Sequence, residues 1–396
     1  MTEEQALFSA IQLHLALRAG SPVTGQILRA GLSPQQVWDP EQMRAHGLAP
    51  LPAPDPEAAQ QCLQRVRSFG MRVITAWDEA YPPLLREIYA PPLVLFAVGT
   101  PPDWSQPTVA MVGTRHSMPE SVQVTQVLAR GLAAGGAIVV SGGAVGIDRA
   151  AHEGALAAGG VTVDVMPCGL DISYPRANET LRQEIVKSGG LLLSEYPPGV
   201  AVNRGCFGLR NRLIAGMCAA TCVIEAPAVS GALITARLAR DQGRDVYAVA
   251  GDLLSEQYAG SRDLLRDGAV TLIDAVQVLQ DLEPRFPGKT DWKAAALAQE
   301  ECRLQLKGTA DPPPPPAPMP RPIPTHPVAC PETVSPAAAQ VYELLKDGPL
   351  SPWELAERIG QPAGTILARL TELEISGCVE ALPGPAYAIR QTGRNR

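Results

Sequence analysis

The stretch TVAMVGTRHS, residues 108–117, joins a short apolar run to a glycine turn, and the helical segment SVQVTQVLARGLAAGG, residues 121–136, follows it. An apolar run without alternation is typical of a strand covered on both faces, and glycines near the end of a helical segment favour a helix terminus. The same unit recurs in AIVVSGG, residues 137–143, followed by GIDRAAHEGALAAGG, residues 146–160. Repeated units of this kind predict an α/β fold with a doubly wound parallel sheet.

The composition limits which partners the chain can meet. Its 396 residues are 46% hydrophobic, which suits two or three globular domains, and its formal net charge is -7. Such a chain is not a bulk cation, so an anionic partner must be met at a small site. No apolar stretch is long enough to span a bilayer, and MTEEQ at the N-terminus has acids where a signal peptide needs a basic start. We therefore expect a cytoplasmic protein with no membrane partner.

Four regions follow from changes in composition along the chain. Residues 1–62 have apolar residues at helical spacing and predict a small helical domain. The strand and helix units occupy residues 70–285. Residues 286–333 form the predicted linker, whose proline-rich end favours an extended spacer. Residues 334–390 have three helical runs, the second opening with a capping box at Ser351, and then a hairpin-like end, an order that predicts a winged helix.

Polar and glycine-rich turns follow several of the predicted strands. They are MVGTRHS, residues 111–117, SGGAVGID, residues 141–148, SEYPPG, residues 194–199, and EAPAVSG, residues 225–231. Ligands of doubly wound sheets bind outside the carboxyl ends of the strands, so we expect these turns to meet there.

The chemistry of these turns suits a phosphate. Glycine lets the backbone approach a ligand, hydroxyls stand beside free amides at helix N-termini, where the dipole favours an anion, and arginines supply full charges. The groups concerned are Gly113, Arg115, Ser141, Gly142, Gly143, Arg212, Ser230 and Gly231. The alternative is that these glycines only make tight turns and Ser230 only caps its helix.

Signatures of the usual nucleotide enzymes are absent. Neither glycine cluster has the G-x-G-x-x-G spacing, and the pattern G-x-x-x-x-G-K-[ST] does not occur, so nicotinamide and nucleoside triphosphate chemistry are disfavoured and no cofactor is predicted. The eight cysteines contain no CxxC pair, which indicates neither a zinc site nor a disulfide framework. Asp148 and His152 lie four apart on a predicted helix, where pairing or capping is commoner than catalysis. We therefore predict no catalytic residue and no enzyme.

The segment FGLRNR, residues 207–212, concentrates an aromatic ring and two arginines. If the chain from Gly208 to Cys218 is helical, its buried stripe contains Leu209, Leu213, Ile214 and Met217. This leaves Asn211 and Arg212 outside the stripe and Arg210 on its border, with Glu225 as its expected partner. A base stacked on Phe207, beside Arg204, would place its phosphates near cations. Phe207 acting as a hydrophobic staple for its own helix is the alternative.

These motifs resemble the DNA-processing protein A (DprA/Smf) family. They are VAMVGTRHS, VVSGGAVGIDRAAHEGAL, MPCGLDISYPRAN, LLLSEYPPG, FGLRNRLIAGM, VIEAPAVSGALITARLA and GSRDLLRDGA, in that order. The resemblance implies an extended Rossmann-like core that binds single-stranded DNA without hydrolysing it, protects incoming strands in natural transformation and loads the RecA recombinase. It also implies a homodimer, a sterile-alpha-motif-like domain before the core and, in some members, a winged helix after it.

The resemblance also implies which residues meet DNA. Carried over by motif, Arg115 meets phosphate, Arg204 stands where a basic residue is usual, and Phe207 stacks on a base. The full set expected to contact DNA is Gly113, Thr114, Arg115, Ser141, Gly142, Gly143, Arg204, Phe207, Arg210, Asn211, Arg212, Ser230 and Gly231. The chain departs from the family pattern at Gly208, where proline is usual, at Ala250, and at Arg262 or Asp263.

Two further expectations concern function. The predicted recognition helix of the winged domain, PAGTILARLTELEISG, has one arginine and two glutamates, so we expect an auxiliary or protein-contact module in which only the tail RQTGRNR attracts phosphate. An enzyme that uses the same pocket for a nucleotide, such as a phosphoribohydrolase, is one alternative, although the PGGxGTxxE signature of that class is absent. The other is a sugar-nucleotide or ribose-phosphate binding module, which would bind mononucleotides tightly and ignore strand length.

Overall fold

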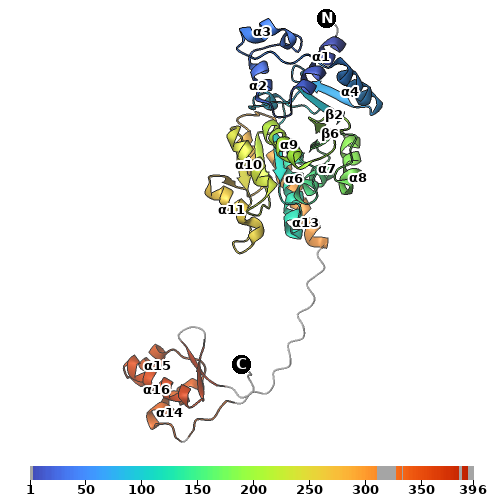
Figure 1. Cartoon of the computed structure of the whole chain (residues 1–396). Helices are drawn as coiled ribbons and strands as arrows, with labels where there is room; N and C mark the ends of the chain where they lie inside the picture. Colours follow the sequence, from blue (N-terminus) through green and yellow to red (C-terminus); the bar gives the residue numbers. More distant parts are fainter. Residues whose placement is uncertain (1–2, 310–326, 332, 383–385, 391–396) are drawn as a thin grey trace. The chain divides into compact units, whose positions relative to one another are not determined.

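The computed structural model describes residues 3–309, 327–331, 333–382 and 386–390. The chain divides into two compact units, Met1–Thr309 and Ala310–Arg396 (Figure 1). Most of the predicted proline-rich spacer, residues 310–326, and the tail after Arg390 lie outside the described residues. No helix in the described part of the chain is long and apolar enough to cross a membrane.

The first unit is built on a nine-stranded sheet with the order β1-β2-β6-β5-β4-β3-β7-β8-β9. All neighbouring pairs from β6 to β9 are parallel, whereas β2 pairs antiparallel with both β6 and β1. The strands are β1 Arg72–Thr75, β2 Val94–Gly99, β3 Thr108–Val112, β4 Ile138–Ser141, β5 Thr162–Met166, β6 Leu191–Ser194, β7 Ala220–Val223, β8 Asp245–Ala248 and β9 Val270–Thr271. The predicted doubly wound parallel sheet is confirmed, with an antiparallel pair added at one edge.

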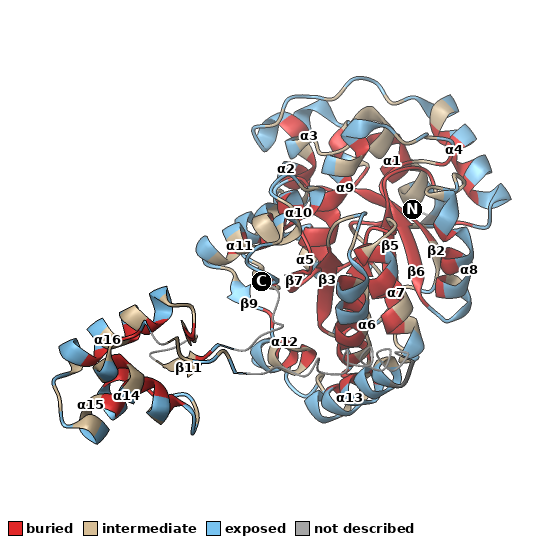
Figure 2. Cartoon of the chain, turned by 90° about the horizontal axis from the view of Figure 1, so that it is seen from below, coloured by how far each residue is buried: buried red, intermediate tan, exposed pale blue. Residues whose placement is uncertain are grey.

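Helices cover both faces of this sheet, and its strands are accordingly buried (Figure 2). Successive residues of β3 face opposite ways: Ala110 and Val112 pack with α9, α10 and α11, whereas Val109 and Met111 pack with α6, α7 and α12. This two-sided burial explains why the strands lack alternation. The helices are α6 Pro119–Ala134, α7 Ile147–Ala157, α8 Glu179–Lys187, α9 Arg204–Met217, α10 Gly231–Asp241, α11 Ala259–Arg266 and α12 Ala275–Leu282.

The N-terminal region is helical and belongs to the same compact unit as the sheet. Its helices are α1 Glu3–Ala16, α2 Pro22–Arg29, α3 Pro40–Ala45 and α4 Pro56–Ser68. Both α3 and α4 begin at an aspartate N-cap followed by proline, an arrangement that satisfies free backbone amides. Ile11 and Leu63 pack with Phe96 of β2, so the antiparallel edge of the sheet carries this region.

The predicted linker begins too early. Residues 292–309 form helix α13, Trp292–Thr309, which packs on α6 and α12. Its Gln299 is buried, and its side-chain oxygen accepts a hydrogen bond of 3.3 Å from the backbone of Ala275. Proline enrichment starts only at residue 312, so composition gave no reason to treat the preceding residues as linker. The first unit therefore extends to Thr309.

The second unit contains a winged helix, as predicted. Its elements are α14 Pro336–Leu345, α15 Pro352–Ile359, α16 Ala363–Ile375, β10 Val379–Ala381 and β11 Tyr387–Ile389. The two strands pair antiparallel, and the three helices share one apolar core with them. Ser351 and Glu354 form the predicted capping box at the start of α15.

Candidate ligand pocket at the carboxyl ends of the strands

A pocket of about 250 Å³ lies where β3, β4 and β7 end. Its size suits a single base or phosphate group more than a large ligand. The residues that line it are Val112, Gly113, Thr114, Arg115, His116, Ala144, Asp148, Phe207, Arg210, Asn211, Ile214, Val229, Ser230, Gly231, Ala232 and Thr235. Three of the four predicted turns therefore meet in space, together with one side of α9 from Phe207 to Ile214.

The most accessible cation of this pocket is Arg115. Its guanidinium carbon lies 4.8 Å from the centre of the Phe207 ring, and the arginine is exposed. Among the described residues Arg115 has no ion-pair partner. Phe207 is partly exposed and lies outside the hydrophobic core clusters of the described chain. Because Asn203 is the N-cap of α9, Val202 and Phe207 occupy the two positions of a hydrophobic staple, and that alternative stays open. A cation above an aromatic face forms a weak contact that a ligand can replace.

The N-terminus of α10 forms the opposite wall. The Ser230 hydroxyl caps the helix by accepting a hydrogen bond of 3.3 Å from the amide of Ala232, and both residues line the pocket. A Cβ at Gly231 would meet no atom within 4 Å, which leaves this end of the helix open. The helix dipole and its free amides favour a negative charge here. Ser230 is thus both a cap and a wall of the pocket.

Arg210 is held from inside the protein, and its predicted partner is wrong. One guanidinium nitrogen donates to the carbonyls of Gly142 and Val165, each at 2.6 Å. Glu225 instead accepts a hydrogen bond of 3.0 Å from the amide of Met118. The side chain of Arg210 bonds to the turn after β4 and not to the turn after β7, because α9 packs over β5 and β3. Burial lowers the pKa of Arg210, and Asp148 counteracts this effect.

The glycines after β4 make room for the protein itself. A Cβ at Gly142 would lie 2.0 Å from the Arg210 guanidinium, and one at Gly143, which has a φ of +61°, would lie 2.3 Å from the Asp164 carboxylate. At these two glycines we expected a ligand to approach the backbone closely. Instead, the buried side chains of Arg210 and Asp164 do so. Ser141 is likewise buried, and its hydroxyl donates to the carbonyl of Met111 at 2.6 Å.

Asp148 is the one carboxylate that lines the pocket. It is buried and accepts a hydrogen bond of 3.3 Å from the amide of Ala144. Burial raises the pKa of Asp148, and the nearby charges of Arg210 and His152 oppose this rise. His152 does not share the pocket, because its ring bonds to the hydroxyl of Thr162 at 2.7 Å inside the core. Asp148 thus lines the pocket, whereas His152 bonds within the core.

Arg212 lies away from the pocket, contrary to the prediction. Its side chain is 9% exposed and forms a buried ion pair with Glu195, and it also donates to the carbonyl of Ala90. On the same side of α9, Leu209 is 36% exposed and lies near Gly20 of the N-terminal region. The prediction of one buried stripe assumed that other elements cover only a single face of α9. In the structure, helix α9 is covered on several sides by the sheet, by α10 and by α5, Pro83–Arg86, and polar side chains of α9 are therefore buried as well.

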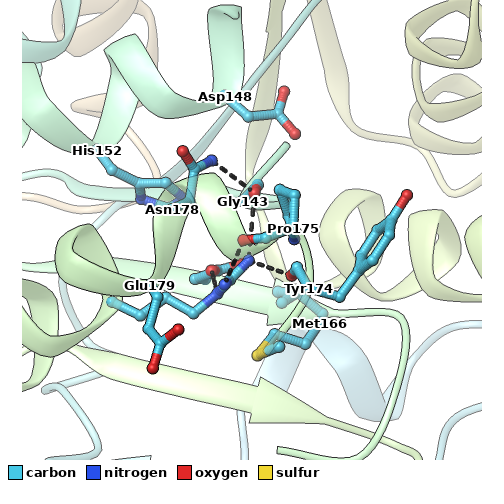
Figure 3. Close-up of polar contacts among 12 residues, drawn as sticks. Gly143, Asp148, His152, Met166, Tyr174, Pro175, Asn178 and Glu179 are labelled. Atoms are coloured by element: carbon cyan, nitrogen blue, oxygen red, sulfur yellow. Dashed lines mark hydrogen bonds and ion pairs between the residues drawn. The ribbon is translucent and has the colours of Figure 1, made fainter. Parts of the chain in front are cut away.

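A buried network fixes the turn after β4 from beneath (Figure 3). The amide nitrogen of Asn178 donates to the carbonyls of Gly143 and Ala144, each at 3.0 Å. Arg182 forms an ion pair of 3.0 Å with Asp164 and donates to the carbonyls of Tyr174 and Pro175. Sequence reasoning did not select Asn178 or Arg182, although Asn178 ends the motif MPCGLDISYPRAN and Arg182 follows it by four residues.

The outcome for the predicted contacts is divided. The pocket brings together Gly113, Thr114, Arg115, Phe207, Arg210, Asn211, Ser230 and Gly231. Ser141, Gly142, Gly143, Arg204 and Arg212 do not line it. Arg204 is exposed at the first turn of α9, and Asn203 caps that helix. His116, Val229 and Thr235 also line the pocket. They lie within the motifs quoted from the sequence, but the prediction did not select them as contacts.

Comparisons with known proteins agree with the fold. A family model described as DNA recombination-mediator protein A matches residues 72–283, and a DprA winged helix domain model matches residues 310–385. Protein Smf of Synechocystis sp. is 32% identical over 335 residues, which cover 83% of each chain. The X-ray structure of DNA processing protein A from Streptococcus pneumoniae aligns with a TM-score of 0.51 at 31% identity, covering 66% of this chain and 96% of that chain.

A further solved structure describes the single-stranded DNA binding mode of DNA processing protein A from Helicobacter pylori. It aligns with a TM-score of 0.48 at 32% identity and covers 54% of this chain and 96% of that chain.

The fold and the pocket define an open α/β protein with an anion-suited site at the carboxyl ends of its strands. The recombination-mediator model covers more than half of the chain, and the relative from Synechocystis exceeds 30% identity over most of both chains. The chain therefore belongs to the DNA recombination-mediator protein A (DprA/Smf) family, a family of DNA-processing proteins. The resemblance stated from the motifs is confirmed.

Proposed function

We propose that this chain binds single-stranded DNA at the pocket formed by β3, α9 and α10, and holds the strand without cutting it. The observation that carries the proposal is the exposed Arg115 guanidinium above the face of Phe207. A base stacks on the ring once Arg115 moves aside, and the guanidinium then covers the base or meets its phosphate. The amides at the start of α10 receive the adjoining phosphate.

Selectivity for single strands follows from the stacking of an unpaired base on Phe207. In a duplex the bases already stack on one another, so none is free to reach Phe207. Phosphate contacts and stacking carry little sequence information, and binding is expected to be independent of sequence. Because the formal net charge is -7, a few close contacts must supply the attraction. Each phosphate contact contributes about -0.7 to the slope of the logarithm of the binding constant against the logarithm of the salt concentration. With few such contacts, the affinity should depend only modestly on salt.

The biological setting is part of the proposal. We infer that the chain protects incoming strands in natural transformation, acts in the cytoplasm and passes the strand to the RecA recombinase. The description of its family as recombination mediators supports this step. A homodimer is also proposed. Supporting it, β9 is an edge strand, its Val270 is 44% exposed, and Ile273 just after it is 72% exposed.

The test is fluorescence anisotropy of a labelled single-stranded oligonucleotide with the full chain. The double variant Arg115→Ala, Phe207→Ala should bind at least about tenfold more weakly, because it loses a stacking platform and a cation. The matched control is Arg67→Ala, Phe69→Ala, which removes an exposed arginine and an exposed phenylalanine from the end of α4. This control should bind as the wild type does.

Competition separates the alternatives. Unlabelled single strand should displace the probe, whereas duplex and mononucleotide should compete poorly. Unchanged binding by the pocket variant would move the DNA site elsewhere. Absence of strand binding together with tight mononucleotide binding would instead favour the nucleotide enzyme, with Asp148 as its pocket carboxylate.

A further inference from the structure

A second aromatic ring lies beside Phe207, at the rim of the pocket. The centres of the Tyr174 and Phe207 rings are 5.8 Å apart, and the ring planes are inclined by 59°. Tyr174 does not line the pocket itself, and it is partly exposed. Together with Arg115, which lies 4.8 Å from the Phe207 ring, the two rings form a short series of planar groups that extends outward from the pocket.

Tyr174 stands on a segment that the core holds in place. The carbonyls of Tyr174 and Pro175 both accept hydrogen bonds from Arg182, which is anchored by Asp164. In Figure 3 the Tyr174 ring extends away from this network and away from the Glu179 carboxylate. The network therefore anchors the backbone beneath Tyr174 and leaves the ring outside. A ring on an anchored backbone loses little conformational freedom when a ligand stacks on it.

The charge around this ring suits a nucleic-acid strand. Arg176, two residues after Tyr174, is exposed and has no ion-pair partner in the described part of the chain. Glu179 is exposed nearby, but it accepts a hydrogen bond of 3.0 Å from the hydroxyl of Ser173. An aromatic face with an exposed arginine two residues along the chain suits a single strand, since the ring meets a base and the cation meets a phosphate.

We propose that Tyr174 is a second stacking platform, on which the base next to the one at Phe207 stacks, with Arg176 contacting the phosphate beside it. This subsite rests on the proposed function, because it extends the same strand out of the pocket. The inclination of 59° between the rings prevents the two bases from remaining parallel. Only an unpaired strand, whose neighbouring bases can separate and turn, fits both platforms. The subsite therefore adds to the selectivity for single strands.

The experiment measures affinity as a function of strand length. Labelled oligothymidylates, from a dinucleotide to a length at which affinity no longer rises, are titrated with the full chain, and a mononucleotide is measured by competition. Tyr174→Leu should weaken binding of the longer strands by about 5- to 30-fold. The same variant should leave the mononucleotide affinity unchanged, because the Phe207 site remains. Arg176→Ala should weaken longer strands by a smaller factor and flatten the salt dependence.

Conservative variants separate stacking from folding. Tyr174→Phe and Tyr174→Trp keep an aromatic face, so both should retain the affinity for long strands. Tyr89→Leu is the matched control, because Tyr89 is 73% exposed and does not line the pocket. Thermal unfolding of each variant checks that the fold is intact.

Each outcome has one meaning. Unchanged affinity of Tyr174→Leu at every length would overturn the second platform while the proposed function stands. An equal loss for mononucleotide and long strands would also overturn it, since Tyr174 would then act only by supporting Phe207. Failure of the wild type to bind any single strand would overturn the proposed function itself.

Discussion

Helix α9 and the turn after β3 place two arginines in opposite environments. Arg115 is exposed, lies over the Phe207 ring and lines the pocket. Arg212, on the far side of α9 from the pocket, is buried against Glu195 and the carbonyl of Ala90. Both are arginines in polar motifs, and their charge is the same. Their surroundings make one available to an anion and commit the other to the packing of the protein.

The difference shows what a ligand-binding cation requires. A buried arginine needs a partner to compensate for lost hydration, and a guanidinium paired in this way is no longer available to a ligand. An exposed arginine without an ion pair keeps its charge for a ligand. Arg210 is intermediate, because it reaches the pocket while two backbone carbonyls hold it. Variants at the two sides of α9 should therefore affect stability and binding separately.

The largest expected effect is on stability. Arg212→Met should lower the free energy of unfolding by about 3–5 kcal/mol, because it leaves the Glu195 carboxylate buried without a partner. Adding Glu195→Leu should recover most of this loss, since a packed apolar pair is nearly neutral. Urea unfolding measures both. If Arg212→Met instead unfolds like the wild type and loses strand binding, the arginine serves the ligand and the comparison fails.

The stability of the first unit should depend on pH through His14 of α1, which is buried near Glu195 and Arg212. Burial lowers the pKa of His14 from its ordinary value of 6.5 to about 4, and the Arg212 charge contributes to the lowering. The unfolded chain binds a proton near pH 6.5 and the folded chain only near pH 4. Stability should thus fall by about 3 kcal/mol as the pH falls through this window.

The variant His14→Leu isolates this titration. Unfolding free energies of wild type and variant, measured across the same pH series, should differ by an amount that changes between pH 6.5 and 4. Parallel profiles would show that the pKa of His14 is the same in the folded and the unfolded chain, so burial would not disfavour its charged form.

On the pocket side, the shape of the cation should matter as well as its charge. Arg115→Lys keeps the charge but loses the planar guanidinium that lies over Phe207. It should weaken strand binding by about 0.5–1 kcal/mol, less than Arg115→Ala, with little change in unfolding temperature. Anisotropy titrations compare the three proteins. Equal affinities of the lysine variant and the wild type would mean that stacking by Arg115 contributes nothing.

The smallest effect should come from the winged helix. Helix α16 carries one arginine and two glutamates, so it lacks the cations of a major-groove reader. A chain that ends at Thr309 keeps the first compact unit, α13 included, and should bind single strands within about 0.5 kcal/mol of the full chain. Loss of binding in the shortened chain would place an essential contact in the second unit.

Local patterns were enough to predict much of the sheet and the pocket. The apolar runs of β3, β4, β5, β7 and β8 end in glycine or polar turns, and a parallel sheet brings such ends to one edge. Arg115 and Ser230 could therefore be placed together from the strand ends, whereas Phe207 was placed there through the segment that follows β6. The winged helix followed from its helix order and from the cap at Ser351.

Contacts between distant segments could not be predicted in the same way. The burial of Arg212 depends on Glu195 after β6 and on the backbone at Ala90, neither of which changes the periodicity of α9. Tyr174 reaches Phe207 only through the anchoring of its segment by Arg182. Helix α13 was missed because the predicted linker began at residue 286, although proline enrichment starts only at residue 312.

Photocrosslinking tests the central claim most directly. A single-stranded oligonucleotide carrying 5-iodouracil is bound to the full chain and irradiated, and the attached peptides are identified by mass spectrometry after tryptic digestion. The account predicts attachment in the peptide from Gly205 to Arg210, which contains Phe207, and its loss when Phe207 is changed to alanine. Attachment confined to helices α1–α4 or to the winged helix would contradict the assignment of the pocket as the DNA site.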